Sequence, residues 1–400
     1  MRAHIAFSLL VAVAAILVVA AALFASPQHG TPFGGGRAPA DVRLGRALGK
    51  VRHIRRRKTG PPKAPRPPLR ETYTLPLSMD VDPGPLVLMA AMPLEVETRS
   101  RGTVVLQTQV DTGSQFLVVT GDTCKNCDRS LGAFPTSEPG RERGTEQHFT
   151  YGIGDYTGSY YQTRLAIDGA TIPLELAVAT ASAPCEGGGL HCNVSIGGLL
   201  PAHASAGEHD RSFLDQVLAT LGGQHRHSFV LDFRAGAEKI VFGAEDAAGV
   251  KVPQVSARRA ANLVGVGGIP YYLVEVRGVT FRADRGGEVR VDMPRHAILD
   301  CGSTSIVCAP RAAAAAARKI HRAAKGGAGT LYIDLGKARL AARIHSPEFA
   351  TTAIMPVDVF DEPPLDKVWV IGLIAMLGNV ITHNVQDRYY TFRRPEPYHV

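Results

Sequence analysis

Two short segments of the chain place an aspartate at the end of an apolar run and just before a glycine turn. They are Val110-Asp111-Thr112-Gly113-Ser114 and Leu299-Asp300-Cys301-Gly302-Ser303, and their aspartates lie 189 residues apart. Each pattern predicts a carboxylate at the end of a buried strand, so the spacing indicates two similar lobes that present their aspartates to each other. Two carboxylates that share a site do not both ionise readily, so the pair keeps one proton and supplies a general base and a general acid together. Hydrolysis of a peptide bond by an activated water uses this chemistry.

A hairpin signal follows about 40 residues after Asp111. The segment Phe149-Thr150-Tyr151-Gly152-Ile153-Gly154-Asp155 places glycines between two alternating β-runs, which predicts a tight turn. Taken alone, this pattern is typical of an ordinary surface turn. Its position relative to Asp111 makes it a candidate part of the same site.

An apolar strand that ends in glycine follows each aspartate. The two strands are Ser195-Ile196-Gly197-Gly198-Leu199 and Trp369-Val370-Ile371-Gly372. Either is consistent with a plain buried strand in which glycine lets another backbone approach closely. Their matching places in the two halves indicate an internal duplication of the lobe.

In these motifs and in their order, from Thr72 to Arg394, the chain resembles the pepsin-type aspartic proteases. The resemblance implies an all-β, bilobal fold, in which two related β-barrel-like lobes have an active-site cleft between them. It implies an aspartic endopeptidase that acts on peptide or protein substrates and needs no metal or organic cofactor.

The resemblance also implies roles for individual residues. Asp111 and Asp300 would be the catalytic pair, and Ser114 and Ser303 would hydrogen-bond the outer carboxylate oxygens. The hairpin would be a flap that closes over the cleft, and a mobile flap excludes water and orients the substrate. The other residues that would support the pair are Thr112, Gly113, Cys301 and Gly302. The flap and substrate-binding residues would be Tyr151, Gly152, Ile153 and Gly154.

Three positions depart from the family pattern. Cys301 stands where the family carries Thr or Ser, whose hydroxyl braces the two loops, and a thiol is a weaker donor and acceptor. Val118 replaces the tryptophan that commonly partners the flap tyrosine, and Leu373 stands where a polar residue is usual. These departures leave a second hypothesis open: a catalytically weak or inactive protease-like binding protein tethered to a membrane.

The length of 400 residues exceeds what one hydrophobic core usually supports, so we expect two lobes. The predicted N-terminal catalytic lobe with the flap covers residues 71–247, and the C-terminal catalytic lobe covers residues 248–400. Apolar spacing predicts a helix over 213–221, and the alanine run predicts another over 311–320. The remaining predicted elements are strands over 228–234, 239–243 and 389–392. We expect a monomer.

The charge of the chain is unevenly distributed. Of its 44 Lys and Arg residues, 13 lie in residues 1–70 beside a single acid, Asp41, whereas 31 bases and 35 acids nearly cancel in the remainder. The Pro/Gly-rich segment 26–70 is therefore predicted to be a basic disordered tether or a propeptide. Its basic run 52–58 could bind nucleic acid or lipid headgroups, but we expect no nucleic-acid partner.

The chain begins with an apolar stretch, Ile5 to Ala25, that carries no charge. Residues 1–25 are predicted to be either a cleaved signal peptide or a signal-anchor transmembrane helix, because the stretch is long enough to span a bilayer. Either directs the protein into the secretory pathway, as a secreted or single-pass membrane protein of the endomembrane or vacuolar system or the cell surface. A signal anchor would bind it to the membrane through residues 5–25.

Six cysteines fit that oxidising route. They fall into three local pairs, although six cysteines allow 15 connectivities. The first pair, Cys124 and Cys127, predicts a structural disulfide, and the second is Cys185 with Cys192. For the third, Cys301 and Cys308, we expect free thiols, because a bridge there would strain the aspartate loop. No histidine or cysteine spacing predicts a metal site.

Overall fold

The computed structural model describes residues 70–393 apart from six gaps, and this part of the chain is mostly β-structure, as predicted. The gaps are residues 82–87, 138–141, 152–153, 184–193, 203–211 and 265–270. The segments predicted as a signal peptide or anchor (1–25) and as a tether or propeptide (26–70) lie outside the described residues, except for Arg70.

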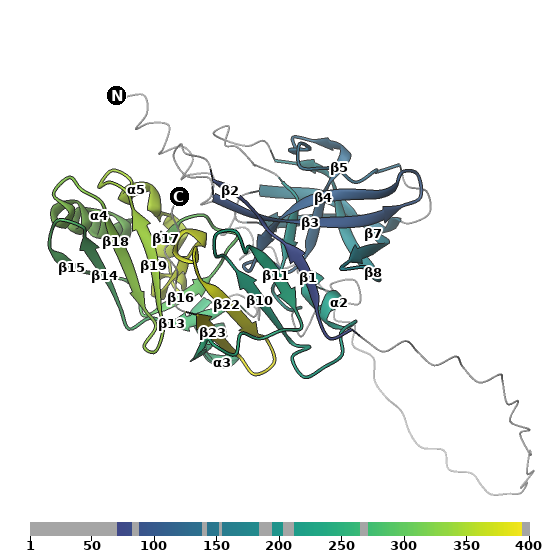
Figure 1. Cartoon of the computed structure of the whole chain (residues 1–400). Coiled ribbons are helices and arrows are strands. Elements are labelled where there is room, and N and C mark those ends of the chain that lie inside the picture. The colour runs from purple at the N-terminus through teal and green to yellow at the C-terminus, as the bar shows by residue number, and fades with distance from the viewer. Residues whose placement is uncertain are drawn as a thin grey trace, which may run out of the picture. The chain divides into compact units, whose positions relative to one another are not determined.

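The first half of the described chain forms an eight-stranded sheet in the order β2-β3-β4-β9-β5-β8-β7-β6 (Figure 1). Its strands are β2 (Ser78–Val81), β3 (Leu88–Thr98), β4 (Gly102–Asp111), β5 (Leu117–Lys125), β6 (Glu142–Tyr151), β7 (Gly154–Ile167), β8 (Ala170–Ser182) and β9 (Ile196–Gly198). The short β9 runs parallel to β4 and antiparallel to β5. This register places Gly198 beside Asp111 at the end of β4.

The second half forms a five-stranded sheet, β13-β16-β21-β17-β20, and a four-stranded sheet, β15-β14-β18-β19. Their strands are β13 (Leu273–Glu275), β14 (Gly278–Ala283), β15 (Glu288–Val291), β16 (His296–Leu299), β17 (Ile306–Cys308), β18 (Gly329–Asp334), β19 (Arg339–Ile344), β20 (Ile354–Pro356) and β21 (Val368–Ile371). Here β21 runs parallel to β16 and antiparallel to β17. The strand before the second aspartate is therefore paired in the same way as the strand that ends at the first.

A six-stranded sheet combines strands from both halves in the order β1-β11-β10-β22-β23-β12. Its strands are β1 (Tyr73–Pro76), β10 (Ser228–Asp232), β11 (Lys239–Phe242), β12 (Val250–Pro253), β22 (Val380–Asn384) and β23 (Tyr389–Arg393). In Figure 1, β22 near the yellow end of the chain lies beside β10, and β23 lies on the other side of β22. The predicted strand pair and the predicted last strand belong to this sheet.

The described helices are few and short. They are α2 (Phe213–Leu218), α3 (Ala257–Val264), α4 (Pro310–Ala324) and α5 (Ala350–Ala353), with the 3-10 turns η1 (Asp358–Asp361), η2 (Leu365–Lys367) and η3 (Leu373–Ala375). The alanine-rich α4 confirms the second predicted helix, because proline suits its first turn and alanine favours its interior. The first predicted helix ends three residues early, at Leu218, where the Thr220 hydroxyl donates to the Val217 carbonyl at 2.7 Å. Leu221 lies beyond the helix but is buried, so its apolar character reflects the core.

A buried histidine lies in the six-stranded sheet. The ring of His383 on β22 stacks on Phe229 of β10, with centroids 4.6 Å apart, and the rings of Tyr272 and Tyr390 meet it edge-on. Burial lowers the pKa of His383 from 6.5 to about 3. The ring is therefore neutral in the folded protein at pH values at which an unfolded chain would carry its charge.

This histidine should make the fold less stable in acid. Between pH 6.5 and about 3, His383 binds a proton in the unfolded chain but not in the folded protein. The free energy of unfolding therefore falls by up to about 1.4 kcal/mol for each unit by which the pH decreases. His383→Phe should remove this slope, as measured by denaturant unfolding at several pH values. His345→Phe makes the same substitution at an exposed position and serves as the control. An equal slope in His383→Phe and the unsubstituted protein would contradict the assignment.

Candidate active site

The two aspartate loops leave the ends of equivalent strands. β4 ends at Asp111, and Asp300 follows β16 directly. Val110 and Leu299, the residues before the aspartates, are completely buried. Burial of these apolar strand ends anchors both loops in the core.

The loops meet through their glycines. A Cβ atom added to Gly302 would lie 2.4 Å from the Asp111 Cγ, and one added to Gly113 would lie 2.8 Å from the Asp300 Cγ. Side chains at these positions would collide with the opposite carboxylate, so both loops need glycine here. Each glycine therefore contacts the other loop's aspartate, and the two carboxylates share one site.

The first carboxylate is held by its own loop. The amide of Gly113 donates to the Asp111 Oδ1 at 2.7 Å, and the hydroxyl of Ser114 donates to the Oδ2. A serine three residues after the aspartate can reach back across the turn, as the sequence interpretation requires. The two donors fix the plane of the Asp111 carboxylate.

The second carboxylate repeats the arrangement. The amide of Gly302 donates to the Asp300 Oδ1 at 2.9 Å, and the hydroxyl of Ser303 donates to the Oδ2 at 2.6 Å. The predicted supporting serines and glycines thus lie around both aspartates, in equivalent positions.

Thr112 and Cys301 bind the two loops together beneath the aspartates. The Thr112 hydroxyl accepts from the Cys301 amide at 2.9 Å and donates to the Leu299 carbonyl at 3.1 Å. In return, the Cys301 thiol donates to the Val110 carbonyl, with sulfur and oxygen 3.3 Å apart. The cysteine therefore occupies the bracing position with a weak donor. Cys301 and Cys308 are both free and buried, which confirms the expectation of free thiols.

Cys301→Thr should strengthen this brace. A hydroxyl is a better donor than a thiol, and we expect the free energy of unfolding to rise by on the order of 1 kcal/mol, with activity preserved or raised. Denaturant unfolding measures the change. Cys308→Thr is the matched control, because it places a hydroxyl at another buried thiol position of this half and should destabilise the fold. Equal destabilisation by both substitutions would contradict the bracing role.

The electrostatics favour one proton on the pair. Burial, followed by the charge of Asp300, raises the pKa of Asp111 well above its usual range. Hydrogen bonds from Ser114 and Gly113 stabilise the ionised form and oppose this shift without cancelling it. The protonated state of Asp111 beside a charged Asp300 combines an acid and a base in one site.

The sequence did not predict two further residues that act near the pair of aspartates, Asp111 and Asp300, which we call the dyad. Burial, then the charges of Asp300 and Asp111, raises the pKa of Tyr271 to about 12, so this phenol lies within electrostatic range of both aspartates. The side chain of Gln109 reaches the second loop, where its amide donates to the Gly302 carbonyl at 2.7 Å. Nothing in the sequence around Tyr271 marks it. The position of Gln109 could have marked it as a site residue, because it lies two residues before Asp111 and therefore on the same face of the strand.

The predicted flap is a hairpin of β6 and β7, with Tyr151 opposite Gly154 in the register. Gly152, Ile153 and the side chain of Tyr151 lie outside the described residues. Phe149 and Tyr156 pair across the hairpin two residues from Tyr151 and Gly154, and both are buried in a cluster with Val118 of β5. The hairpin therefore packs against the strand that leaves the first aspartate loop.

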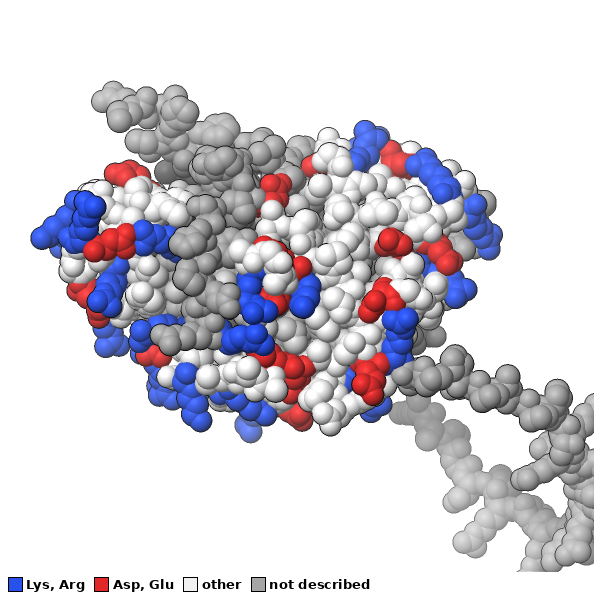
Figure 2. All heavy atoms as spheres, viewed as in Figure 1, with Lys and Arg blue, Asp and Glu red and all other residues white. Residues whose placement is uncertain are grey.

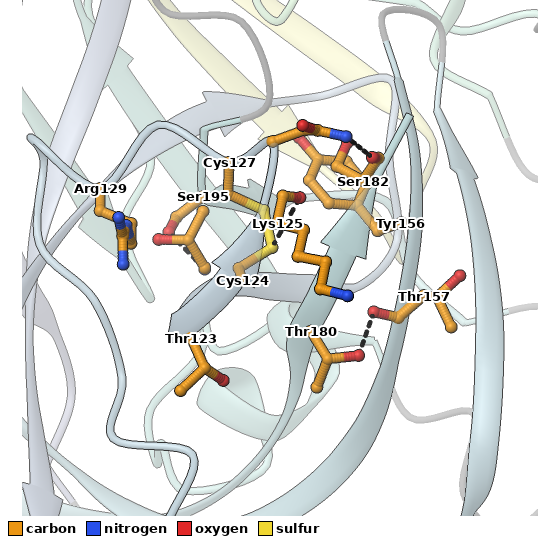
Figure 3. Close-up of a disulfide and its surroundings, with 12 residues drawn as sticks. Thr123, Cys124, Lys125, Cys127, Arg129, Tyr156, Thr157, Thr180, Ser182 and Ser195 are labelled. Atoms are coloured by element: carbon orange, nitrogen blue, oxygen red, sulfur yellow. Dashed lines mark hydrogen bonds between the residues drawn. A yellow bond between two sulfur atoms is a disulfide. The ribbon is translucent and has the colours of Figure 1, made fainter. Parts of the chain in front are cut away.

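A disulfide joins Cys124 and Cys127 at the end of β5, which confirms the first predicted pair. Cys124 belongs to the same apolar cluster as Tyr156, and Figure 3 shows that side chain beside the disulfide. The Tyr156 hydroxyl donates to the Val194 carbonyl at 2.9 Å. The disulfide therefore lies where the hairpin packs against β5. Cys185 and Cys192 lie outside the described residues.

Acidic and basic side chains are interspersed on the face that Figure 2 draws, in keeping with the near balance of charge after residue 70. Within the described part of the chain, no group of three or more His, Cys, Asp and Glu residues is arranged to hold a metal ion. Across the same residues, no helix is both long and apolar enough to cross a membrane.

Comparison with known proteins gave no identification: no protein-family model and no curated protein matches the chain.

Proposed function

We propose that this protein is an aspartic endopeptidase with a bilobal, pepsin-like fold of two related β-barrel-like lobes, in which a water held between Asp111 and Asp300 hydrolyses peptide bonds. One observation carries the proposal: each aspartate is held by the glycine and serine of its own loop while contacting the glycine of the other. This mutual contact supports the proposal because two carboxylates must lie close together to share one proton.

The reaction divides acid and base roles between the two carboxylates. Ionised Asp300 takes a proton from the water as its oxygen attacks the scissile carbonyl carbon. Protonated Asp111 hydrogen-bonds the developing oxyanion and then supplies the proton that the leaving nitrogen needs when the carbon–nitrogen bond breaks. An extended peptide would bind in the cleft under the hairpin through backbone hydrogen bonds.

The same proposal includes the cellular setting. The apolar segment 5–25 and the Cys124–Cys127 disulfide support passage through the secretory pathway, since disulfides persist in oxidising compartments. The protein would then be a secreted or single-pass membrane enzyme that meets peptide or protein substrates there.

Incubation of the purified full-length protein with an unfolded protein across pH 3 to 7 tests the proposal. We expect fragments below neutrality, and we expect pepstatin to prevent them while a chelator has no effect. Cleavage that a chelator abolishes and pepstatin does not would refute the dyad. Complete inertness would favour the alternative, a membrane-tethered binding protein on a protease-like scaffold.

A further inference from the structure

We infer that Gln109 is a positioning residue that holds the second aspartate loop in place for catalysis; the inference rests on the proposed function and deepens it. Gln109 lies on β4, two residues before Asp111, and it is buried. Its amide donates to the Gly302 carbonyl at 2.7 Å, across 193 residues of sequence. The nitrogen of the side chain must face that oxygen, because the carbonyl can only accept.

The backbone of Gln109 is itself firmly placed. It pairs with Ile196 of the parallel β9, and its amide donates to the Ser195 carbonyl at 2.8 Å. The side chain therefore extends from a fixed strand to a loop of the other half. A donor on a rigid element positions its acceptor better than one on a mobile segment does.

Gly302, the residue that Gln109 holds, contacts both aspartates. Its amide donates to the Asp300 Oδ1 at 2.9 Å, and its Cα faces the Asp111 carboxylate so closely that an added Cβ would lie 2.4 Å from the Asp111 Cγ. A shift of this one residue would alter the hydrogen bond to Asp300 and the contact with Asp111 together. Gln109 therefore acts on the dyad through Gly302.

The matching position of the other half cannot make this contact. The position two residues before Asp300 is Ile298, an apolar side chain that donates no hydrogen bond. The brace is also unequal, since Thr112 supplies a hydroxyl and Cys301 only a thiol. We infer that the bond from Gln109 compensates for the weak thiol in joining the two loops.

Gln109→Met tests the inference, because methionine has a similar length and no donor. We expect kcat to fall on the order of tenfold with KM nearly unchanged, since a misplacement of about 1 Å at reacting groups can cost about 100-fold. Gln107→Met is the matched control: it makes the same change two residues earlier on β4, where the side chain makes no bond to the second loop. An unchanged kcat in Gln109→Met, or an equal loss in Gln107→Met, would overturn the inference.

A second substitution tests the compensation. The bond from Gln109 and the brace at Cys301 are both inferred to join the two aspartate loops. If they do, Cys301→Thr should raise kcat more in the Gln109→Met background than in the unsubstituted protein. Equal effects in the two backgrounds would show that the two residues act independently, and the compensation would be wrong.

A readout that needs no catalysis separates this inference from the proposed function. Loosening the second loop should weaken the influence of the Asp300 charge, so the carboxyl carbon of Asp111, followed by NMR, should titrate at lower pH in Gln109→Met than in the unsubstituted protein. An unchanged titration would overturn the positioning role. If the protein cleaves nothing but this titration moves, the proposed function fails and the positioning role stands.

Discussion

Replacement of either Asp111 or Asp300 by asparagine should abolish peptide cleavage. Each carboxylate has a separate task, and acid–base groups typically contribute about 10²- to 10⁴-fold to the rate. Because the two act as one unit, each single variant should lose nearly as much activity as the double variant, by more than about 1,000-fold. Initial rates on an unfolded protein substrate measure the loss.

A control variant and a measurement of fold stability complete this test. Asp292→Asn changes an exposed aspartate paired with Lys319 and should leave the rate unaltered. Asp111→Asn should not destabilise the fold at neutral pH. The pKa of Asp111 is raised on folding, so its ionisation opposes folding as pH rises above 3.8, and asparagine removes that cost. Substantial cleavage by either single variant would mean that the paired-carboxylate mechanism is wrong.

Gly302→Ala should strongly reduce activity while the protein still folds. The new Cβ would lie 2.4 Å from the Asp111 Cγ, and the colliding atoms belong to a side chain that can turn away. We expect the fold to survive and the displaced carboxylate to cost on the order of 100-fold in kcat. Activity and the thermal midpoint, measured on one preparation, separate the two effects.

Gly372→Ala is the matched comparison, with the opposite expectation. There the added Cβ would lie 2.0 Å from the Ser305 carbonyl oxygen and 2.6 Å from that of Ser303, and both atoms belong to the backbone. The backbone must shift, so we expect Gly372→Ala to lower the thermal midpoint strongly. A Gly302→Ala variant with full activity would show that the loops do not meet as described.

The sequence predicted those parts of the site that depend on local pattern. The aspartates after Val110 and Leu299, and the serines three residues later, have hydrogen bonds that a tight turn alone produces. The expectation of a mostly β fold is confirmed for the described residues. The alanine-rich α4 followed from helix propensity, which needs no knowledge of the core.

Contacts between distant segments could not be predicted in this way. The charges of both aspartates act on Tyr271, which lies in a part of the chain that no motif marks, and the bond from Gln109 to Gly302 depends on how the two halves meet. The early end of α2 was also not predictable from local pattern. Leu221 continues the apolar spacing of the helix, but it lies beyond the helix and is buried in the core. The thiol of Cys301 was expected to brace poorly, and only the structure places it against the Val110 carbonyl.

The dependence of kcat/KM on pH tests the shared proton most directly. A fluorogenic peptide cleaved by the full-length protein should give a bell-shaped profile with its maximum below neutrality. The rate should fall at lower pH, where both carboxyls are protonated, and at higher pH, where Asp111 loses the shared proton. A rate that continues to rise through pH 8 would show that an ionised dyad is sufficient or that another group attacks, and it would contradict the mechanism.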